Sequence, residues 1–407
     1  MANSEEKLSN RRFNSDLLQA ATAERLAWFE NRAVEHRMMD ATKKHLRRLL
    51  RSGRRYPVIL LVGPTGIGKS TLLTIVKNEI IRELLPSLEA NPGQIPIASV
   101  EAFSPESGSF NWKDHYTNCL AELRDVLIMN KLKDVDCELC RGKIRLNDNS
   151  RVSAPTFRHA LVHALIHRRP LGFFIDEAQH LMKMSSGRGV LDQMDVIKCI
   201  AGATRIPHVL FGTYDLLLMR NLNGQLSRRN FEIHFSRYKY DNSADLLEFR
   251  KVLRSFESLM PITETPDLQT HRDFIYERSL GCVGTLKEWL SRALELALDE
   301  PSEQLTLEHL GDTAMSITRC KKIAEEIHSG ETQLSEDITA RPKLLSLLGM
   351  TKGSNSRANR STNPGGPTLK NGEPPDTANP PKSSTNKRGP LEQRPKRHDT
   401  KRRERAA

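Results

Sequence analysis

Apolar positions follow two alternating patterns between residues 57 and 235. Short, nearly continuous apolar runs, typical of buried strands, lie at 57–63, 95–103, 170–176, 207–213 and 231–235. Between them apolar residues recur with helical spacing, and these segments are Ser70–Leu85, Trp112–Leu132, Pro155–His167, Val190–Thr204 and Asp215–Leu226. Strands that alternate with helices of this length predict an α/β fold, in which helices cover both faces of a parallel sheet.

Beyond about residue 243 the strand pattern ends and only helical spacing remains. The helical segments there are Ala244–Leu259, Gln269–Ser279, Val283–Leu298 and Leu305–His328, and they predict a small helical domain, called the lid below. Before the first strand, Asp16–Ser52 is also helical and runs into the basic stretch KKHLRRLLRSGRR. We therefore divide the chain into an N-terminal helical extension at 1–52, an α/β core at 53–242, a helical lid at 243–345 and a tail at 346–407.

Charge is unevenly distributed among these parts. The chain has 62 Lys and Arg against 50 Asp and Glu, a net charge of +12. Residues 351–407 contain 14 of the basic and 5 of the acidic residues, so +9 of the +12 lies there. Because this stretch is rich in Pro, Gly, Ser and Asn and poor in apolar residues, it predicts a disordered basic tail. The tail serves either as a DNA-binding arm or as a docking peptide for a partner protein, and the sequence does not separate these uses.

Several classes of protein are disfavoured by what the sequence lacks. No run of 18 or more apolar residues is present, so a membrane span is not expected. The polar start MANSEEKLSNRRF does not resemble a secretion signal, and six cysteines in 407 residues do not make a disulfide framework. We expect a reduced, cytoplasmic protein. Cys137 and Cys140 form a lone C-x-x-C pair, which lacks the second pair that a structural zinc site normally needs.

The stretch GPTGIGKST follows the first strand and opens the next helix. It satisfies G-x-x-x-x-G-K-[ST], a pattern in which glycines let backbone N–H groups wrap phosphates at a helix N-terminus. Lys69 is expected to reach the β- and γ-phosphates, and the Ser70 hydroxyl to bind Mg²⁺. The sequence therefore predicts binding of ATP and Mg²⁺ by Gly63, Pro64, Thr65, Gly66, Ile67, Gly68, Lys69, Ser70 and Thr71.

Polar residues end two later strands. Asp176 and Glu177 follow the run LGFFI, which is the Walker-B position of a P-loop protein. Asp176 is expected to hold the magnesium shell, and Glu177 to orient the attacking water. Thr213 ends the strand HVLFG and is expected to sense the γ-phosphate or the water; the alternative is a cap of the next helix, together with Asp215.

The order of these motifs resembles the AAA+ ATPases, and more closely the TniB/TnsC group of transposition regulators. The resemblance covers roughly residues 20–330 and depends on the segments downstream of the Walker motifs, which are NLNGQLSRRNFEIHFSRY, GCVGTLKEWLSRAL and CKKIAEEI. It implies that Arg228 or Arg229 reaches across a subunit interface to a neighbour's γ-phosphate, a role that suits the planar, permanently charged guanidinium. A solvated basic corner is the alternative for this pair. The resemblance also implies that Lys287 contacts nucleotide from the lid, although a lysine at a helix start is often simply exposed.

The same resemblance implies partners. They are duplex DNA, further copies of this chain in a ring or helix, a transposase and a separate target-selecting protein, all in a bacterial cytoplasm. Lys113, in FNWKDHY, and Lys143 and Arg145, in the segment 133–153, are the candidate phosphate contacts. Trp112 and Tyr116 could stack on bases, but they equally fit a helix core. No base-reading motif is evident, so we expect DNA binding to be largely independent of base sequence.

Two other functions remain open. One is a replication initiator or helicase loader of the same superfamily, for which TAMSITRCKKIAEEI would have to form a winged-helix domain. The other is a signalling NTPase whose basic tail binds a protein. ATP-dependent binding to DNA distinguishes the second alternative from a transposition regulator.

Overall fold

The computed structural model describes residues 11–52, 57–105, 108, 110–125, 154–183, 189–219, 230–335 and 340–350. Residues Met1–Asp337 form one compact unit and Ile338–Ala407 a second. Within the described residues, no helix is long and apolar enough to cross a bilayer.

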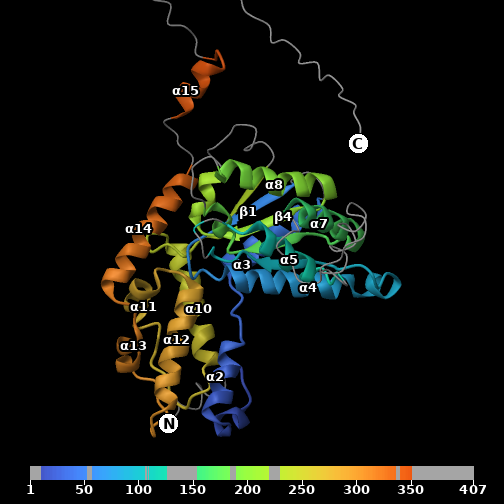
Figure 1. Ribbon diagram of the computed structural model, residues 1–407. Coiled ribbons are helices and arrows are strands. Elements are labelled where there is room, and N and C mark those ends of the chain that lie inside the picture. Colours follow the sequence, from blue (N-terminus) through green and yellow to red (C-terminus); the bar gives the residue numbers. More distant parts are fainter. Residues whose placement is uncertain are drawn as a thin grey trace, which may run out of the picture. The chain divides into compact units, whose positions relative to one another are not determined.

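A five-stranded parallel sheet forms the centre of the first unit (Figure 1). The strands are β1 (Val58–Val62), β2 (Ala98–Glu101), β3 (Phe173–Asp176), β4 (His208–Gly212) and β5 (Asn230–His234), in the spatial order β2-β3-β4-β1-β5. Each predicted strand is present, which confirms the α/β fold with a parallel sheet. Because all strands are parallel, their carboxyl ends meet at one edge, which receives the residues that follow β1, β3 and β4.

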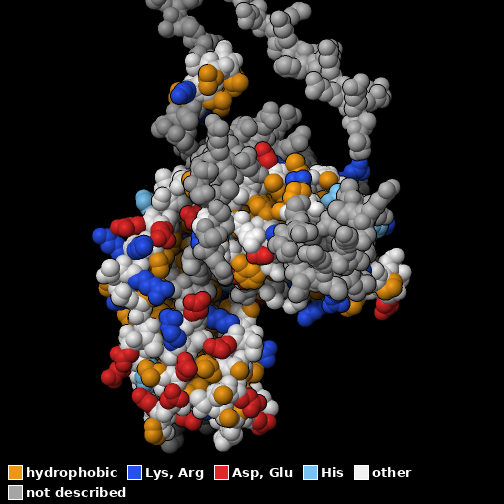
Figure 2. Space-filling model, in the orientation of Figure 1, with side chains coloured by type: hydrophobic (Ala, Val, Ile, Leu, Met, Phe, Trp, Pro, Cys, Tyr) orange, Lys and Arg blue, Asp and Glu red, His pale blue; other side chains and the backbone are white. Residues whose placement is uncertain are grey.

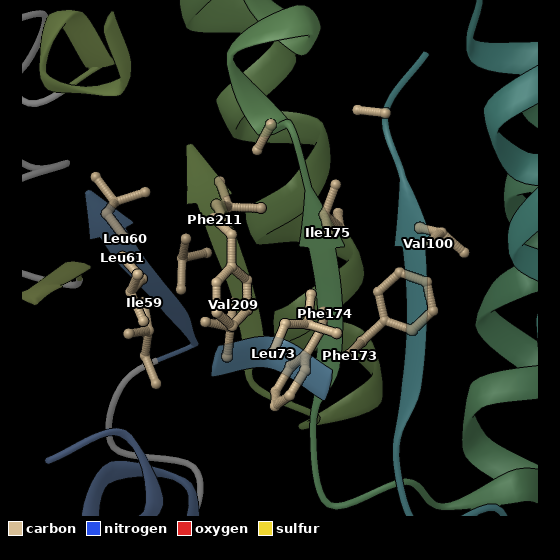
Figure 3. Close-up of a cluster of buried hydrophobic side chains, with 14 of the residues drawn as sticks. Ile59, Leu60, Leu61, Leu73, Val100, Phe173, Phe174, Ile175, Val209 and Phe211 are labelled. Atoms are coloured by element: carbon tan, nitrogen blue, oxygen red, sulfur yellow. The ribbon is translucent and has the colours of Figure 1, made fainter. Parts of the chain in front are cut away.

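The central strands β3, β4 and β1 are mostly apolar because the sheet is covered on both faces, whereas the outer strands β2 and β5 include polar residues such as Ser99 and Glu232. All five residues of β1 and of β4 are buried. The molecular surface, in contrast, carries Lys, Arg, Asp and Glu side chains among its apolar ones (Figure 2). Figure 3 shows buried apolar side chains of the neighbouring strands, among them Leu61 of β1 and Phe211 of β4, which are partners in the strand register. Helices α4 (Lys69–Ala90) and α8 (Gly189–Thr204) lie on opposite sides of the sheet in Figure 1. Helices α5 (Trp112–Glu122) and α7 (Ala154–Arg168) pack on each other beside β2.

The helices after the sheet form a second apolar cluster, distinct from that around the sheet. They are α10 (Ser243–Leu259), α11 (Arg272–Ser279), α12 (Val283–Leu298) and α13 (Leu307–Thr313). Helix α2 (Thr22–Glu30) contributes Phe29 to this cluster. Arg25 of α2, which is almost fully buried, donates to the carbonyl of Pro261 at 2.8 Å and pairs with Glu303 at 2.8 Å. The N-terminal segment is therefore an integral part of the lid's packing.

Helix α3 (Arg37–Arg51) packs instead on the α/β core, against α4 and β5. Its basic face is paired with glutamates of α4. Lys43 and Arg47 both contact Glu79, at 3.0 and 2.5 Å, and Arg51 contacts Glu83 at 2.6 Å. Partial burial alone would raise the pKa of Glu79, but hydrogen bonds from Lys43 and Arg47 hold it below its ordinary value. Three basic residues of this segment are therefore paired with carboxylates within the fold.

The predicted single helix Leu305–His328 is wrong. Helix α13 ends at Thr313 and α14 (Ile317–Leu334) begins after a separate cap, in which the Ser316 side chain accepts the N–H of Arg319. Helix α14 returns to the core, where Ile327 joins the cluster around the sheet. It packs so closely there that a Cβ on Gly330 would lie 2.1 Å from the ring of Tyr214.

Two further predictions changed in extent. The predicted helix Asp16–Ser52 is divided into a 3-10 helix η1 (Ser15–Gln19) followed by α2 and α3. The predicted helix from Trp112 to Leu132 ends at Glu122 as α5, and residues 126–153 lie outside the described part. Trp112 and Tyr116 belong to the core side of α5, since Tyr116 is buried and the Trp112 ring packs 5.1 Å from it. Their interpretation as helix core is therefore the one that the packing supports.

The second unit contributes one described helix, α15 (Ala340–Leu347). Leu344 and Leu347 of this helix and the following Leu348 are exposed. The predicted disordered tail beyond residue 350 lies outside the described residues.

Candidate nucleotide-binding site

The phosphate-binding loop connects β1 to α4 at the carboxyl edge of the sheet. Gly66 and Gly68 adopt φ angles of 72° and 104°, which residues with a side chain rarely reach. Gly63 leaves no room for a Cβ, because that atom would lie 2.5 Å from the carbonyl oxygen of Phe235. The three glycines of the motif are therefore required by the backbone as well as by the expected approach of phosphate.

Lys69 begins α4, and its side chain turns back into the loop. It is 6% exposed, and its Nζ donates to the carbonyls of Gly63 at 3.2 Å and Pro64 at 2.9 Å. Burial lowers the pKa of the ammonium, and the charges of Glu177 and Asp176 act in the opposite direction. Two carboxylates from the end of β3 therefore lie near enough to Lys69 to interact with it electrostatically.

Asp176 and Glu177 lie where β3 meets the 3-10 helix η3 (Ala178–Met182). Glu177 has a left-handed backbone, with φ 49° and ψ 34°, which is uncommon and strained for a residue other than glycine. Its N–H donates to the Asp176 carboxylate at 2.9 Å, and this bond holds the turn. Glu177 thus lies in a strained turn directly after β3, at the same edge of the sheet as the phosphate-binding loop.

Gln179 is a residue of this site that the sequence did not indicate. Its amide nitrogen donates to Oε2 of Glu177 at 2.5 Å, and its amide oxygen accepts the N–H of Thr213 at 3.3 Å. The only sequence signal was its position two residues after the predicted base, within DEAQHL.

Thr213 lies beside these groups at the end of β4. Its hydroxyl donates to Asp215 at 3.2 Å, within the first turn of the 3-10 helix η4 (Tyr214–Met219). The geometry therefore gives the hydroxyl a local partner, while the backbone N–H faces Gln179. A sensor role for Thr213 stays a prediction.

The start of α12 lies directly on the phosphate-binding loop. The N–H of Thr285 donates to the carbonyl of Gly66 at 2.7 Å. A Cβ on Gly284 would lie 2.5 Å from that same oxygen. Lys287, the predicted lid contact, instead donates to the carbonyl of Glu30 at 2.6 Å, and burial lowers its pKa. Its nucleotide contact stays a prediction, and Thr285 is the lid residue that touches the loop.

The residues around the loop suit magnesium bound together with a nucleotide. Mg²⁺ in such sites uses one or two protein oxygens and completes its shell with phosphates and water. Ser70 follows Lys69 at the exposed start of α4, and Asp176 offers a carboxylate near Lys69. Among the described residues no three His, Cys, Asp or Glu side chains come together as a possible metal site.

The remaining predicted positions are only partly within the described chain. Lys113 lies in the first turn of α5, with its Nζ 5.8 Å from the centre of the Phe157 ring; its DNA contact stays a prediction. Arg228, Arg229, Lys143, Arg145 and the pair Cys137 and Cys140 lie outside the described residues.

Comparison with known proteins identifies the core. Residues 50–220 match the family model of an AAA domain. This range contains the phosphate-binding loop, Asp176, Glu177 and Thr213, so this part of the chain is an AAA+ P-loop domain. No curated protein sequence matches the chain.

Matches to solved structures have low sequence identity and low TM-scores. The ORC2 protein of Aeropyrum pernix, in its ADPNP–ADP complexes, is 18% identical with a TM-score of 0.43, over 69% of this chain and 68% of that one. Cdc6p from Pyrobaculum aerophilum is 16% identical with a TM-score of 0.46, over 70% and 69%. A Walker-type ATPase of Pyrococcus abyssi is 16% identical with a TM-score of 0.40, over 79% and 82%. None of these matches tests the narrower resemblance to the TniB/TnsC group, which stays a prediction.

Proposed function

We propose that this chain binds and hydrolyses ATP to switch its own assembly on duplex DNA, as a regulator of transposition. The observation that carries the ATPase assignment is the convergence of three charged groups at one edge of the sheet. The buried Lys69 ammonium lies within electrostatic reach of Asp176 and Glu177. A cation beside phosphates and a carboxylate beside the attacking water are the two groups that hydrolysis of a γ-phosphate requires.

The residues divide the chemistry between them. Backbone N–H groups of the loop wrap the phosphates, and Lys69 exchanges its bonds to the Gly63 and Pro64 carbonyls for phosphate oxygens. Glu177 accepts a proton from water as the water oxygen attacks the γ-phosphorus, so that ADP and inorganic phosphate leave. Ser70 and Asp176 would hold Mg²⁺, which would neutralise negative charge on the phosphates when bound.

Assembly on DNA is the finer part of the proposal. The net charge of +9 over residues 351–407 supports a phosphate-rich partner. We assign Arg228 or Arg229 to the γ-phosphate of a neighbouring subunit, so that ATP joins subunits and hydrolysis releases them. The resemblance of the motif order to the TniB/TnsC group supports transposition as the process. A gene for an integrase-like transposase beside that of this chain would support it further.

A set of four variants tests the proposal in the full-length chain. Lys69→Ala is expected to abolish binding of a fluorescent ATP analogue, whereas Lys77→Ala, two turns along the same helix, is expected to bind normally. Glu177→Gln is expected to bind ATP and to give a longer-lived complex in DNA co-sedimentation, because only activation of water is lost. Replacing Arg228 and Arg229 together by Ala is expected to spare ATP binding but to abolish both hydrolysis and assembly.

Each arm has a contrary outcome. Normal nucleotide affinity of Lys69→Ala would remove the phosphate-site assignment, and wild-type hydrolysis by Glu177→Gln would remove the base. An absence of ATP-dependent co-sedimentation with DNA in the wild type would favour the signalling NTPase instead.

A further inference from the structure

One amide links the proposed base to the neighbouring strand. Gln179 donates from Nε2 to Oε2 of Glu177 at 2.5 Å and accepts at Oε1 from the N–H of Thr213 at 3.3 Å. A carboxylate can only accept and a backbone N–H can only donate, so these two partners fix which way the amide faces. Both ends of the Gln179 side chain are therefore committed to the nucleotide site.

The end of β4 is shaped to admit this amide. A Cβ on Gly212 would lie 2.6 Å from Oε1 of Gln179 and 2.7 Å from Cδ1 of Leu216. Any side chain at position 212 would therefore push the amide away from Thr213. The close approach of β4 to Gln179 depends on glycine at this position.

The bond from Gln179 decides where the Glu177 carboxylate lies. The backbone of Glu177 is held by the left-handed turn and by its N–H bond to Asp176, but its side chain retains three rotatable bonds. Strand β4 lies between β3, which leads to Glu177, and β1, which leads to the phosphate-binding loop. A bond toward the end of β4 therefore directs the carboxylate toward the loop, in agreement with its electrostatic interaction with Lys69.

We propose that Gln179 is a positioning residue for hydrolysis, which holds Glu177 toward the phosphates and in a fixed relation to the end of β4. The inference rests on the proposed function, because it requires Glu177 to be the base. The Gln179 amide donates to Oε2 of Glu177, which leaves Oε1 to accept a hydrogen bond from the attacking water. The water oxygen bonds to the γ-phosphorus, the bond from that phosphorus to the bridging oxygen breaks, and the proton passes to Glu177.

Steady-state hydrolysis by the full chain, with saturating duplex DNA, tests this role. Gln179→Ala is expected to lower kcat by roughly 10–100-fold, since small misplacements of a catalytic group cost about that much. KM and the Kd of a fluorescent ATP analogue are expected to stay within about threefold, because Lys69 and the loop glycines are unchanged. Gln179→Glu keeps an oxygen for the Thr213 N–H but loses the donor to Glu177 and adds a like charge, so it is expected to be at least as slow.

Gln94→Ala is the matched control. Gln94 is also half-buried and its amide donates to the carbonyl of Arg169 at 3.4 Å, but it precedes β2 at the opposite edge of the sheet. This variant is expected to retain the wild-type kcat. A fall in kcat equal to that of Gln179→Ala would show that loss of a glutamine amide acts through general stability and would overturn the proposal.

A double-mutant cycle identifies the residue through which Gln179 acts. In the Glu177→Gln background, Gln179→Ala is expected to cause no further loss in single-turnover rate, because the group that it positions is already disabled. A further loss equal to that caused by Gln179→Ala alone would overturn the proposal. A wild-type kcat for Gln179→Ala, together with an inactive Glu177→Gln, would also overturn it but would leave the proposed function intact. Wild-type hydrolysis by Glu177→Gln would instead overturn both.

Discussion

Thr213 has two polar groups that bond in different directions, and they carry different roles. The hydroxyl donates to Asp215 at 3.2 Å, which stabilises the start of η4. The backbone N–H donates to Gln179 at 3.3 Å, and Gln179 in turn donates to the Glu177 carboxylate. A substitution that changes only the side chain can therefore separate local capping from catalysis.

We predict that Thr213→Val retains ATP hydrolysis within about threefold of the wild type. Valine has the same shape and keeps the N–H that Gln179 accepts, while the lost hydroxyl bond is worth about 1 kcal/mol of stability. Initial rates at saturating ATP measure this, with Gln179→Ala as the comparison. A loss of tenfold or more at unchanged ATP affinity would instead assign the hydroxyl to the γ-phosphate or the attacking water.

Residues with a fixed spacing to the phosphate-binding motif were predictable, and residues set by tertiary contact were not. Lys69 is specified by its position in the loop, and Asp176 and Glu177 by the end of an apolar strand. Gln179 and Thr285 join the site only because β4 lies between β3 and β1 and because α12 begins at the loop. Neither relation is encoded in local periodicity. The nucleotide contact of Lys287 was implied by the family resemblance and stays a prediction, with its ammonium bonded here to the Glu30 carbonyl.

Among the elements, α12 and the phosphate-binding loop meet backbone to backbone. Gly284 faces the Gly66 carbonyl, and a Cβ there would also lie 3.1 Å from the backbone N of Gly68. Backbone atoms cannot rotate away as a flexible side chain can. The contact between Gly284 and Gly66 therefore fixes the distance between the lid helix α12 and the loop. The contact links the position of α12 to the conformation of the loop that binds phosphates.

We predict that Gly284→Ala destabilises the protein by about 1–3 kcal/mol, the usual cost of overpacking, and weakens ATP binding. The sign is informative, because alanine within a helix normally stabilises it by about 0.5–1 kcal/mol relative to glycine. Gly311→Ala in α13 is the control, since no atom lies within 4 Å of its added Cβ. Urea unfolding and nucleotide titration measure both effects. Equal stability of the two variants would refute the close contact.

The five strands of the core were predictable because short, mostly apolar runs are typical of strands in a covered sheet. The helix expected at Asp215–Leu226 is a 3-10 helix over Tyr214–Met219, and the rest of that range lies outside the described residues. The break between α13 and α14 was missed, since apolar residues continue with helical spacing through it and only the Ser316 cap marks the new start. The pairing of basic α3 with Glu79 and Glu83 was also missed, because those glutamates lie over 30 residues away along the chain.

Across the whole first unit, buried histidines make folding depend on pH. His36, His115 and His208 are each about 5% exposed or less. Burial lowers the pKa of each to about 4. The charge of Asp40 acts against this lowering at His36, and a hydrogen bond to the Ile206 carbonyl acts against it at His208. The neighbouring His208 lowers the pKa of His115 further. In the unfolded chain a histidine has a pKa of about 6.5. Between about pH 6.5 and 4 the unfolded chain therefore binds protons that the folded chain does not.

We therefore predict that the free energy of unfolding falls as the pH is lowered from about 6.5 to about 4, by up to about 1.4 kcal/mol per pH unit for each buried histidine. The full contribution is present above the unfolded pKa, where neither state is protonated. His208→Phe keeps a ring against Phe173 but cannot titrate. The slope of the unfolding free energy against pH is therefore expected to fall by up to about 1.4 kcal/mol per pH unit, which corresponds to one proton. His159→Gln, at an exposed position of α7, is the control for replacing a histidine elsewhere in the chain. Urea unfolding at a series of pH values decides the matter: a wild-type slope in His208→Phe would mean that His208 is protonated equally in the folded and unfolded chain.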